Sequence, residues 1–227
     1  MKYKIIADSS SDLLDDYIID DEIDFEVVPL TIHVDGKEFI DNKNLNVKEM
    51  LKAMHDFKGK STSSCPSPLG FMDSYTADYN FVVTITSKLS GTYNCANLAA
   101  TNIENKKTFV IDSKATSGTE VLIVDKLYEL IKQGLSYETI CSEIIKYRDS
   151  LELYFILNDF DNLVKNGRMS KIAASVAKIM AIKPICKAIE GEIKIHKKVR
   201  TRRVAIKDMV EEICAFNNEN KKCVWKL

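Results

Sequence analysis

The sequence contains no long apolar run, few histidines and no paired cysteines. No stretch approaches the ~20 uninterrupted apolar residues of a membrane-spanning helix, so we expect no stable insertion into a membrane. The apolar part of the N-terminus is too short for a signal peptide, which favours a cytoplasmic location. The three histidines and six cysteines include no Cys-x-x-Cys pair, so we expect no metal site and no cofactor. Free, mostly buried thiols are the expected state of the cysteines.

Motifs for nucleotide binding and for serine hydrolysis are also absent. The sequence has no complete P-loop, G-x-x-x-x-G-K-[ST], because Met54 stands where the glycine before Gly59-Lys60-Ser61 would be required; it also has no G-x-G-x-x-G turn and no G-x-S-x-G elbow. The three histidines lie outside the serine-rich turns described below, so no base is evident beside a nucleophilic serine. Asp8, Asp12 and Asp112 could supply paired carboxylates, but aspartates at strand ends more often cap helices or form turns. We therefore predict a protein that is not an enzyme and has no catalytic residues.

The 227 residues have a net charge of −1, but the charges are unevenly distributed. Residues 1–56 hold 14 Asp/Glu against 6 Lys/Arg, and residues 161–207 hold 13 Lys/Arg against 3 Asp/Glu. A basic half can indicate nucleic-acid binding. The basic section lacks interleaved aromatic residues and any recognition-helix signature, so we expect no nucleic-acid partner.

One strand and the hydroxyl-rich turn after it are the most informative feature of the chain. Residues 81–85 form a short apolar run typical of a strand covered on both faces. Ser90, Gly91 and Thr92 follow where a helix over about 90–104 begins. The unpaired N–H groups and partial positive charge of a helix N-terminus, together with hydroxyl donors, favour binding of an anionic oxygen. The alternative is that Ser90 only caps its helix.

Two further β-type runs end in similar turns. Residues 4–7 precede a Ser/Asp turn at 8–12 and a helix-like segment at 13–17, and residues 108–111 precede a Ser/Thr turn at 112–119. If the strands are parallel neighbours, all three turns lie at the carboxyl edge of one sheet, where open α/β sheets bind ligands. The pattern predicts an α/β fold with a mainly parallel sheet and helices on both faces.

We expect a domain boundary near residue 150, with an α/β domain over 1–150 and a second, smaller α/β domain over 151–227. In the first domain we also expect a strand at 24–34, which Pro29 places at a sheet edge, a hairpin turn at 35–36, a helix at 46–55, a Ser/Pro loop at 59–68 and a helix from 69 to 77. Two helices should follow the turn at 112–119, one ending near 132 and one at 136–148. In the second domain we expect a strand at 151–157, a short helix or turn at 160–168, a helix at 170–180, a hairpin around 190–191 and a helix at 202–216. Small residues on the 170–180 helix suit either close helix packing or the lining of a tunnel.

Six segments in order resemble the DegV family of bacterial fatty-acid-binding proteins, and together they cover nearly the whole chain. They are Asp8-Ser-Ser-Ser-Asp12, Ser64-Cys-Pro-Ser-Pro68, Thr86-Ser-Lys-Leu-Ser-Gly-Thr-Tyr-Asn-Cys-Ala96, Asp112-Ser-Lys-Ala-Thr-Ser-Gly118, Leu163-Val-Lys-Asn-Gly-Arg-Met-Ser170 and Lys198-Val-Arg-Thr-Arg202.

The resemblance implies a two-domain α/β fold with a long-chain fatty acid, such as palmitate or oleate, buried between the domains. It implies that the carboxylate is held by Ser63 and Ser90, with Gly91 and Thr92 at the helix start. Arg200 could neutralise the acid. Family members act as acyl carriers that present the acid to a fatty acid kinase, which makes an acyl phosphate for phospholipid synthesis.

Three departures from the family pattern affect these expectations. Alignment on Pro66-Ser67-Pro68 puts Ser63 at the position of the carboxylate-binding threonine, with Thr62 as the alternative. Asn166 replaces the first glycine of a Gly-Gly-Arg segment, which Asn tolerates because it enters left-handed conformations. A further portion ending near a His-x-Gly-Pro-Gly motif is absent, so we expect a truncated carrier or a second copy covering the gap. The alternatives to a carrier are a serine-dependent acyl hydrolase and a non-catalytic, regulatory lipid-sensing module.

Overall fold

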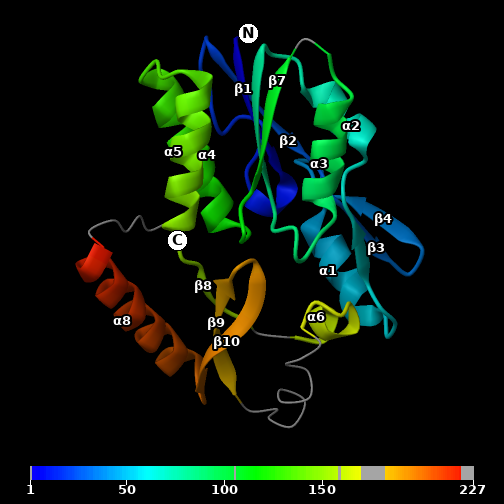
Figure 1. The fold of residues 1–227 in the computed structure, drawn as a ribbon. Helices are drawn as coiled ribbons and strands as arrows, with labels where there is room; N and C mark the ends of the chain where they lie inside the picture. The colour runs from blue at the N-terminus through cyan, green and yellow to red at the C-terminus, as the bar shows by residue number, and fades with distance from the viewer. Residues whose placement is uncertain (1, 105, 158–159, 170–181, 221–227) are drawn as a thin grey trace. The chain divides into compact units, whose positions relative to one another are not determined.

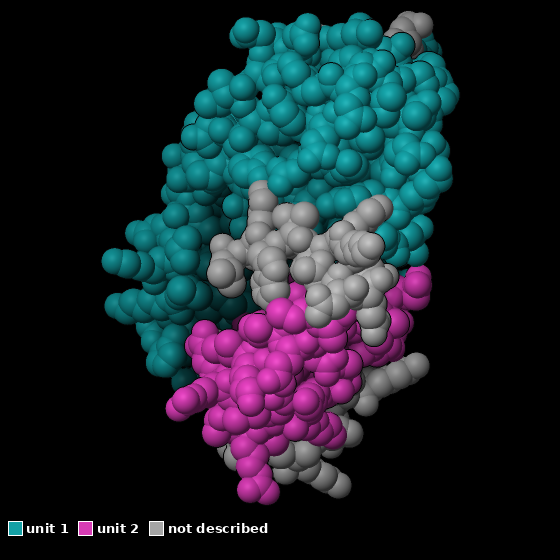
Figure 2. Space-filling view, turned by 90° about the vertical axis from the view of Figure 1, so that its left-hand side faces the viewer, with its two compact units in different colours: residues 1–151 teal, residues 152–227 magenta. Residues whose placement is uncertain are grey.

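The computed structural model describes residues 2–104, 106–157, 160–169 and 182–220 (Figure 1). The chain divides into two units, residues 1–151 and 152–227, which Figure 2 shows in different colours. Each unit is described below by itself. The predicted helix at 170–180 lies outside the described residues. No helix among the described residues is both long and apolar enough to cross a membrane.

The first unit is built around a four-stranded parallel sheet. Its strands are β1 (Tyr3–Asp8), β2 (Ile23–Val28), β6 (Tyr79–Thr84) and β7 (Lys107–Asp112), in the order β2-β1-β6-β7. Every pair of neighbours runs parallel, so the carboxyl ends of β1, β6 and β7 meet at one edge. The prediction that these three strands belong to one sheet is confirmed.

Helices cover both faces of this sheet, as predicted (Figure 1). Helices α4 (Gly118–Lys132) and α5 (Tyr137–Asp149) lie on one face, and α2 (Pro68–Ser74) and α3 (Thr92–Thr101) lie on the other. Alternate residues of each strand point to opposite faces, and two separate buried clusters result. The larger cluster contains Ile5, Phe81, Ile111, Leu127 and Ile144, and the other contains Ile6, Phe71, Tyr75, Val82 and Ala99.

The connection from β1 to β2 differs from the prediction, because residues 13–17 form a turn and not a helix. Only a short 3-10 turn, η1 (Ser9–Ser11), follows β1, and it ends at Asp12 with φ of 60°. Asp15 instead accepts a hydrogen bond from the backbone N–H of Val27 at 2.9 Å. Aspartates compete with helical hydrogen bonds by binding nearby backbone groups, which explains the missing helix.

The segment predicted as one strand at 24–34 is two strands in different sheets. Pro29 follows β2, which is an edge strand of the parallel sheet, and β3 (Thr31–Val34) then begins a second sheet. Proline cannot donate a ladder hydrogen bond, so the chain leaves the first sheet there.

The second sheet is antiparallel and has the order β4-β3-β5. The hairpin from β3 to β4 (Lys37–Ile40) turns at Asp35 and Gly36, with φ of 51° and 74°, as predicted from the Asp-Gly pair. Strand β5 (Thr62–Ser64) lies inside the segment that we expected to be a loop. Helix α1 (Val47–Asp56) begins where Asn46 accepts a hydrogen bond from the backbone N–H of Glu49.

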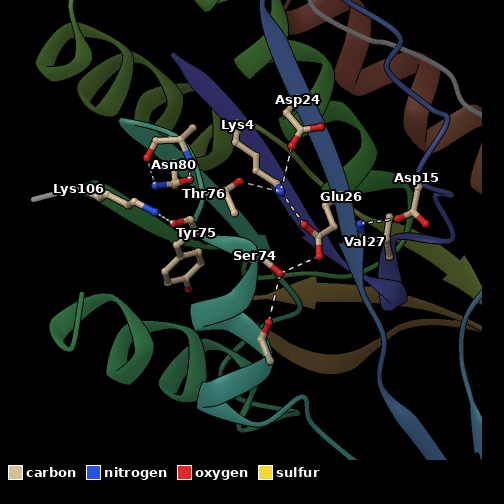
Figure 3. A network of polar contacts seen from close by, with 12 residues as sticks. Lys4, Asp15, Asp24, Glu26, Val27, Ser74, Tyr75, Thr76, Asn80 and Lys106 are labelled. Atoms are coloured by element: carbon tan, nitrogen blue, oxygen red, sulfur yellow. Dashed lines mark hydrogen bonds and ion pairs between the residues drawn. The ribbon is translucent and has the colours of Figure 1, made fainter. Parts of the chain in front are cut away.

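The buried Lys4 side chain, on the inner strand β1, links the edge strand β2 to the residues at the end of α2 (Figure 3). The Lys4 ammonium lies 2.6 Å from Glu26 and 3.0 Å from Asp24, and it donates to the Thr76 hydroxyl at 3.2 Å. Ser74 donates to the other oxygen of Glu26 at 2.9 Å. Burial alone would lower the pKa of Lys4, but the hydrogen bonds to Glu26 and Asp24 outweigh it and raise that pKa. The lysine is therefore charged at neutral pH.

The second unit contains an antiparallel sheet with the order β10-β9-β8. Its described elements are β8 (Tyr154–Ile156), α6 (Asp161–Lys165), β9 (Lys183–Ile189), β10 (Glu192–Val199) and α8 (Arg202–Asn220). The hairpin turns at Glu190 and Gly191, both with positive φ, as the Glu-Gly pair predicts. Ile185, Val199 and Ala205 form the centre of a small core between this sheet and α8. The unit is thus a smaller α/β structure, as predicted.

Candidate functional site

The three polar turns lie at the carboxyl edge of the parallel sheet and are hydrogen-bonded to one another. Asp8, at the end of β1, accepts a hydrogen bond from the backbone N–H of Ile85 at 2.7 Å. The backbone N–H of Thr86 in turn donates to the carbonyl of Ala115 at 2.9 Å, and that of Ser117 donates to the carbonyl of Ser10 at 3.0 Å. Each turn is therefore held by the other two.

Asp8 and Glu120 form a buried pair of carboxyl groups bridged by one hydroxyl. Ser10 Oγ lies 2.5 Å from Asp8 Oδ1 and 2.6 Å from Glu120 Oε1. Since a hydroxyl has one proton, it can donate to only one of these oxygens, and the other carboxyl must donate to it. Asp8 also accepts from the backbone N–H groups of Ser10 and Ile85, so Asp8 carries the charge and Glu120 the proton.

Burial explains why Asp8 and Glu120 hold one proton between them, because it disfavours two neighbouring negative charges. Both side chains are fully buried. Burial raises the pKa of Asp8, and burial together with the Asp8 charge raises the pKa of Glu120 well above its usual value. The chain therefore uses Asp8 as a structural acceptor, which agrees with the expectation that strand-end aspartates form turns.

A second aspartate fixes the turn after β6 from the other side. Asp112, at the end of β7, accepts the Ser87 hydroxyl at 2.5 Å and the Ser87 N–H at 3.3 Å. The N–H of Ser90 then donates to the carbonyl of Thr86 at 3.3 Å. Residues 85–90 are thus anchored on both neighbouring strands, and this anchoring sets the position of Ser90.

Ser90, Gly91 and Thr92 lie at the start of α3, as predicted. Gly91 is the N-cap residue, and no side chain of the described residues caps this helix in the usual way. Ser90 is half-buried, and its hydroxyl lies 2.8 Å from that of the buried Thr92. Two hydroxyls and the first N–H groups of a ten-residue helix are therefore grouped together, which suits an anionic oxygen.

Ser63 and Thr62 lie on β5 and point to opposite faces of the second sheet, because neighbouring residues of a strand alternate. Thr62 is exposed and pairs in register with His33, whereas Ser63 is half-buried and pairs with Ile32. Ser64 bonds the His33 imidazole at 2.9 Å.

The residue that follows β5 in sequence, Cys65, lies in space beside the start of α3. Cys65 Sγ lies 3.5 Å from Cys95 Sγ, in the first turns of α3, and it would lie 3.4 Å from a Cβ atom added to Gly91. The segment carrying Ser63 therefore ends against the helix start that carries Ser90.

The remaining predicted residue, Arg200, belongs to the second unit. It is exposed and follows β10. Its role in the site stays a prediction. Within the described residues, no group of three or more His, Cys, Asp or Glu side chains is arranged to hold a metal ion.

The cysteines are less buried than expected. Among those described, only Cys186 is buried, while Cys65, Cys95 and Cys141 are half-buried and Cys214 is exposed. Burial and the neighbouring Cys65 thiol raise the pKa of Cys95 to about 11. The contact between Cys65 and Cys95 could not be predicted from the sequence, because thirty residues separate them and no spacing rule links them.

A cleft of about 280 Å³ opens beside η1, at some distance along the chain from Ser63 and Ser90. Its lining includes Asp12, Asp15 and Asp41, with Lys43 as the one basic residue among the described lining residues. Three carboxylates repel an anionic ligand, so this cleft is a poor candidate for a carboxylate site.

Comparisons with known proteins identify relatives along almost the whole chain. The family described as "Uncharacterised protein, DegV family" matches residues 2–225. A DegV domain-containing protein of Streptococcus pyogenes serotype M1 is 37% identical over 219 residues, which are 94% of this chain and 78% of the relative. A DegV domain-containing protein of Streptococcus gordonii is 38% identical over 221 residues, with the same coverage.

Solved structures share the fold. The fatty acid kinase (Fak) B3 protein of Streptococcus pneumoniae, loaded with linoleic acid, is 36% identical, with a TM-score of 0.88 over 95% of this chain and 79% of that chain. A DegV family protein from Eubacterium eligens, loaded with heptadecanoic acid, is 32% identical, with a TM-score of 0.82 over 92% of this chain and 78% of that chain. The match over residues 2–225 and the shared fold show that the chain belongs to the DegV family.

Proposed function

We propose that this protein binds a long-chain fatty acid and holds its carboxylate with the hydroxyls of Ser63 and Ser90 and the N-terminus of α3. The observation that carries the proposal is the grouping of the Ser90 and Thr92 hydroxyls at a helix start whose N-cap residue, Gly91, has no side chain to cap it; the one described side-chain contact there is the weak bond from the Thr92 N–H to Ser90 Oγ at 3.4 Å. Each hydrogen bond to a charged group contributes about 1.5–3 kcal/mol. Two hydroxyls and a helix dipole can therefore supply most of the specificity for a carboxylate.

Burial and strand alternation support Ser63 over Thr62 as the second hydroxyl. Ser63 is half-buried on a strand whose next residues reach the start of α3, whereas Thr62 is exposed on the opposite face. A hydrogen bond to a carboxylate is stronger where solvent competes less. We assign the contact to Ser63 and keep Thr62 as the variant that tests the assignment.

The ligands of structural relatives support a fatty acid over other anions. The Streptococcus pneumoniae protein is loaded with linoleic acid and the Eubacterium eligens protein with heptadecanoic acid. The shared feature of these ligands is a carboxylate on a long apolar chain, so palmitate and oleate are suitable probes. Burial of such a chain provides most of the affinity, at about 0.8 kcal/mol per CH₂ group.

The absence of a base beside Ser90 supports a carrier over an acyl hydrolase. Ser90 Oγ bonds the Thr92 hydroxyl and the Thr92 N–H within the described residues, and neither group can accept its proton at neutral pH. We propose that the bound carboxylate stays ionised at the helix start and is presented to a kinase, which transfers a phosphoryl group to it. The kinase partner is inferred from the family and from the fatty acid kinase B3 relative.

The test is lipid extraction from the purified protein, followed by mass spectrometry and by titration with palmitate or oleate. We expect a copurified long-chain acid, and Ser90→Ala should weaken binding about tenfold or more, because one charge-assisted bond of about 1.5–3 kcal/mol is lost. Ser63→Ala should weaken binding to a similar degree.

Matched controls lie on the same strand. Thr62→Ala and Ser64→Ala change exposed residues of β5 on the face opposite Ser63, so binding should be unchanged. Protein that is empty and does not take up added acid would refute the proposal. Turnover of an acyl ester that Ser90→Ala abolishes would favour the hydrolase instead.

A further inference from the structure

Two thiols from distant parts of the first unit meet at the candidate carboxylate site. Cys65 lies in the loop between β5 and α2, and Cys95 lies on α3, yet their Sγ atoms are 3.5 Å apart. Both cysteines are half-buried, and neither belongs to the fully buried core. Cys65 also lies against the start of α3, because a Cβ atom added to Gly91 would be in van der Waals contact with its sulfur at 3.4 Å.

We propose that Cys65 and Cys95 are a redox-sensitive pair that a peroxide converts into an intramolecular disulfide. A disulfide requires a sulfur–sulfur distance of about 2.05 Å, so the two atoms must approach by about 1.5 Å. Within the described residues, no other pair of cysteines has its sulfur atoms in contact.

The chemistry needs only a peroxide and the two thiols. The Cys65 thiolate attacks one peroxide oxygen, an S–O bond forms, the O–O bond breaks, and the departing hydroxide leaves as water after taking up a proton. The Cys95 sulfur then attacks the resulting sulfenic acid, an S–S bond forms and the S–O bond breaks, and the Cys95 proton leaves with the hydroxide as a second water. Two thiols are oxidised and one hydrogen peroxide is reduced to two waters.

The order of attack follows from the surroundings of Cys95. Because the pKa of Cys95 is raised to about 11, this thiol keeps its proton at neutral pH and acts as the resolving group. The first attack is therefore assigned to Cys65. A reducing dithiol reverses the reaction by thiol–disulfide exchange.

The disulfide would tie the segment that follows Ser63 to the helix that begins after Ser90. This consequence rests on the proposed function, because both serines are assigned to the fatty-acid carboxylate. A covalent link between the two halves of the carboxylate site restricts their separation. We therefore expect the oxidised protein to release a bound fatty acid more slowly than the reduced protein.

Disulfide formation is tested without any ligand. The reduced full-length chain is treated with hydrogen peroxide at neutral pH, alkylated, digested and analysed by mass spectrometry. We expect one peptide pair joined through Cys65 and Cys95, two fewer free thiols per chain, and reversal by dithiothreitol. The inference is overturned if peroxide leaves both thiols free, joins either to another cysteine, or yields only sulfinic or sulfonic acids at Cys65.

Three variants separate this pair from general oxidation. Cys95→Ser should leave a sulfenic acid on Cys65 that dimedone traps, whereas Cys65→Ser should leave Cys95 unreacted. Cys141→Ser, in a half-buried cysteine of α5, should form the 65–95 disulfide like the wild type. Equal labelling of Cys65 and Cys141 by dimedone in Cys95→Ser would contradict a specific pair.

The effect on ligand is measured separately, as the rate of oleate release from the oxidised and reduced forms. If the disulfide forms and the protein binds no fatty acid, the proposed function fails and the redox pair stands. If fatty acid binds and no disulfide forms, the redox pair fails and the proposed function stands.

Discussion

Replacing Asp8 and Glu120 separately by their amides tests the shared proton at the sheet edge. The structure assigns the charge to Asp8 and the proton to Glu120, so the two substitutions should have unequal effects. Glu120→Gln keeps a donor facing Ser10 Oγ and keeps the shape of the side chain. Asp8→Asn removes an ionised acceptor and places an NH₂ group against at least one donor.

The expected difference follows from the hydrogen bonds of Asp8. This side chain accepts from the N–H groups of Ser10 and Ile85 and from the Ser10 hydroxyl. Asparagine offers one carbonyl oxygen, so at least one buried donor loses a charge-assisted bond worth about 1.5–3 kcal/mol, and the bonds that remain become weaker. We expect Asp8→Asn to cost about 3–5 kcal/mol and Glu120→Gln to cost less than about 1.5 kcal/mol.

The pH dependence has a defined sign. The folded state raises the pKa of both carboxyls, so between their ordinary values, near 4, and the folded values the native protein binds a proton that the unfolded chain has released. This contribution to stability is fully present below about pH 4 and is lost as pH rises toward the folded pKa. Glu120→Gln cannot lose that proton, so its stability relative to the wild type should increase with pH.

The assay is urea unfolding at several pH values between 5 and 8, followed by circular dichroism. Asp41 and Asp12 also lie near these turns, where they accept hydrogen bonds from Ser9 and Ser117, and both are retained in the wild type and in each variant. Equal losses for the two amides, or a larger loss for Glu120→Gln, would refute the assignment of charge and proton. A difference between Glu120→Gln and wild type that stays constant with pH would refute the titration.

Three further predictions concern stability of the first unit and use the same unfolding assay. Lys4→Met should cost about 1–3 kcal/mol, because Glu26 and Asp24 lose their partner but remain partly hydrated, whereas the exposed Lys2→Met should be neutral. Because the pKa of Lys4 is raised, its contribution should persist below about pH 10.5 and disappear above it; a loss that is independent of alkaline pH would contradict this. Asn46→Ala should cost about 0.5–2 kcal/mol through the lost N-cap of α1, and Asn46→Ser should restore most of it. Gly36→Ala should cost about 1 kcal/mol through its positive φ alone, since no atom lies within 4 Å of the added Cβ; Gly36→Asn should cost less.

The parallel sheet could be predicted because its strands are buried on both faces. Residues 81–85 and 108–111 are short apolar runs between polar turns, a pattern that few other structures produce. The hairpins at 35–36 and 190–191 were predictable for a similar reason, since both need positive φ at two adjacent residues. Strong local requirements of this kind leave a clear mark on the sequence.

The elements that were missed have no such mark. Strand β5 has three polar residues, Thr62–Ser64, and exists only because β3 offers a free edge. Leu13 and Tyr17 have helical spacing, but Asp15 between them accepts a hydrogen bond from the backbone N–H of Val27, and the helix does not form. In both places a partner that is distant in sequence decides the local structure.

The candidate site shows the same division between local and distant causes. Ser90, Gly91 and Thr92 could be placed at a helix start from their own neighbourhood, and the structure has them there. The meeting of Cys65 with Cys95, and of Asp8 with Glu120, depends on tertiary contacts that no spacing rule encodes. An acid at the start of an apolar helix, as at Glu120, is the one sequence signal that could have indicated a buried polar network.

The position of Ser90 is set less by its own helix than by the two turns on either side of it. Asp8 holds the N–H of Ile85 and Asp112 holds Ser87, so the first half of the short path from β6 to Ser90 is fixed by the strands on either side of β6. If Ser90 holds a carboxylate as we propose, such support matters, because an error of about 1 Å weakens a directional hydrogen bond severely. Under the proposed function, Asp8 and Asp112 would therefore contribute to binding without touching the ligand, because they order the turn before the ligand arrives.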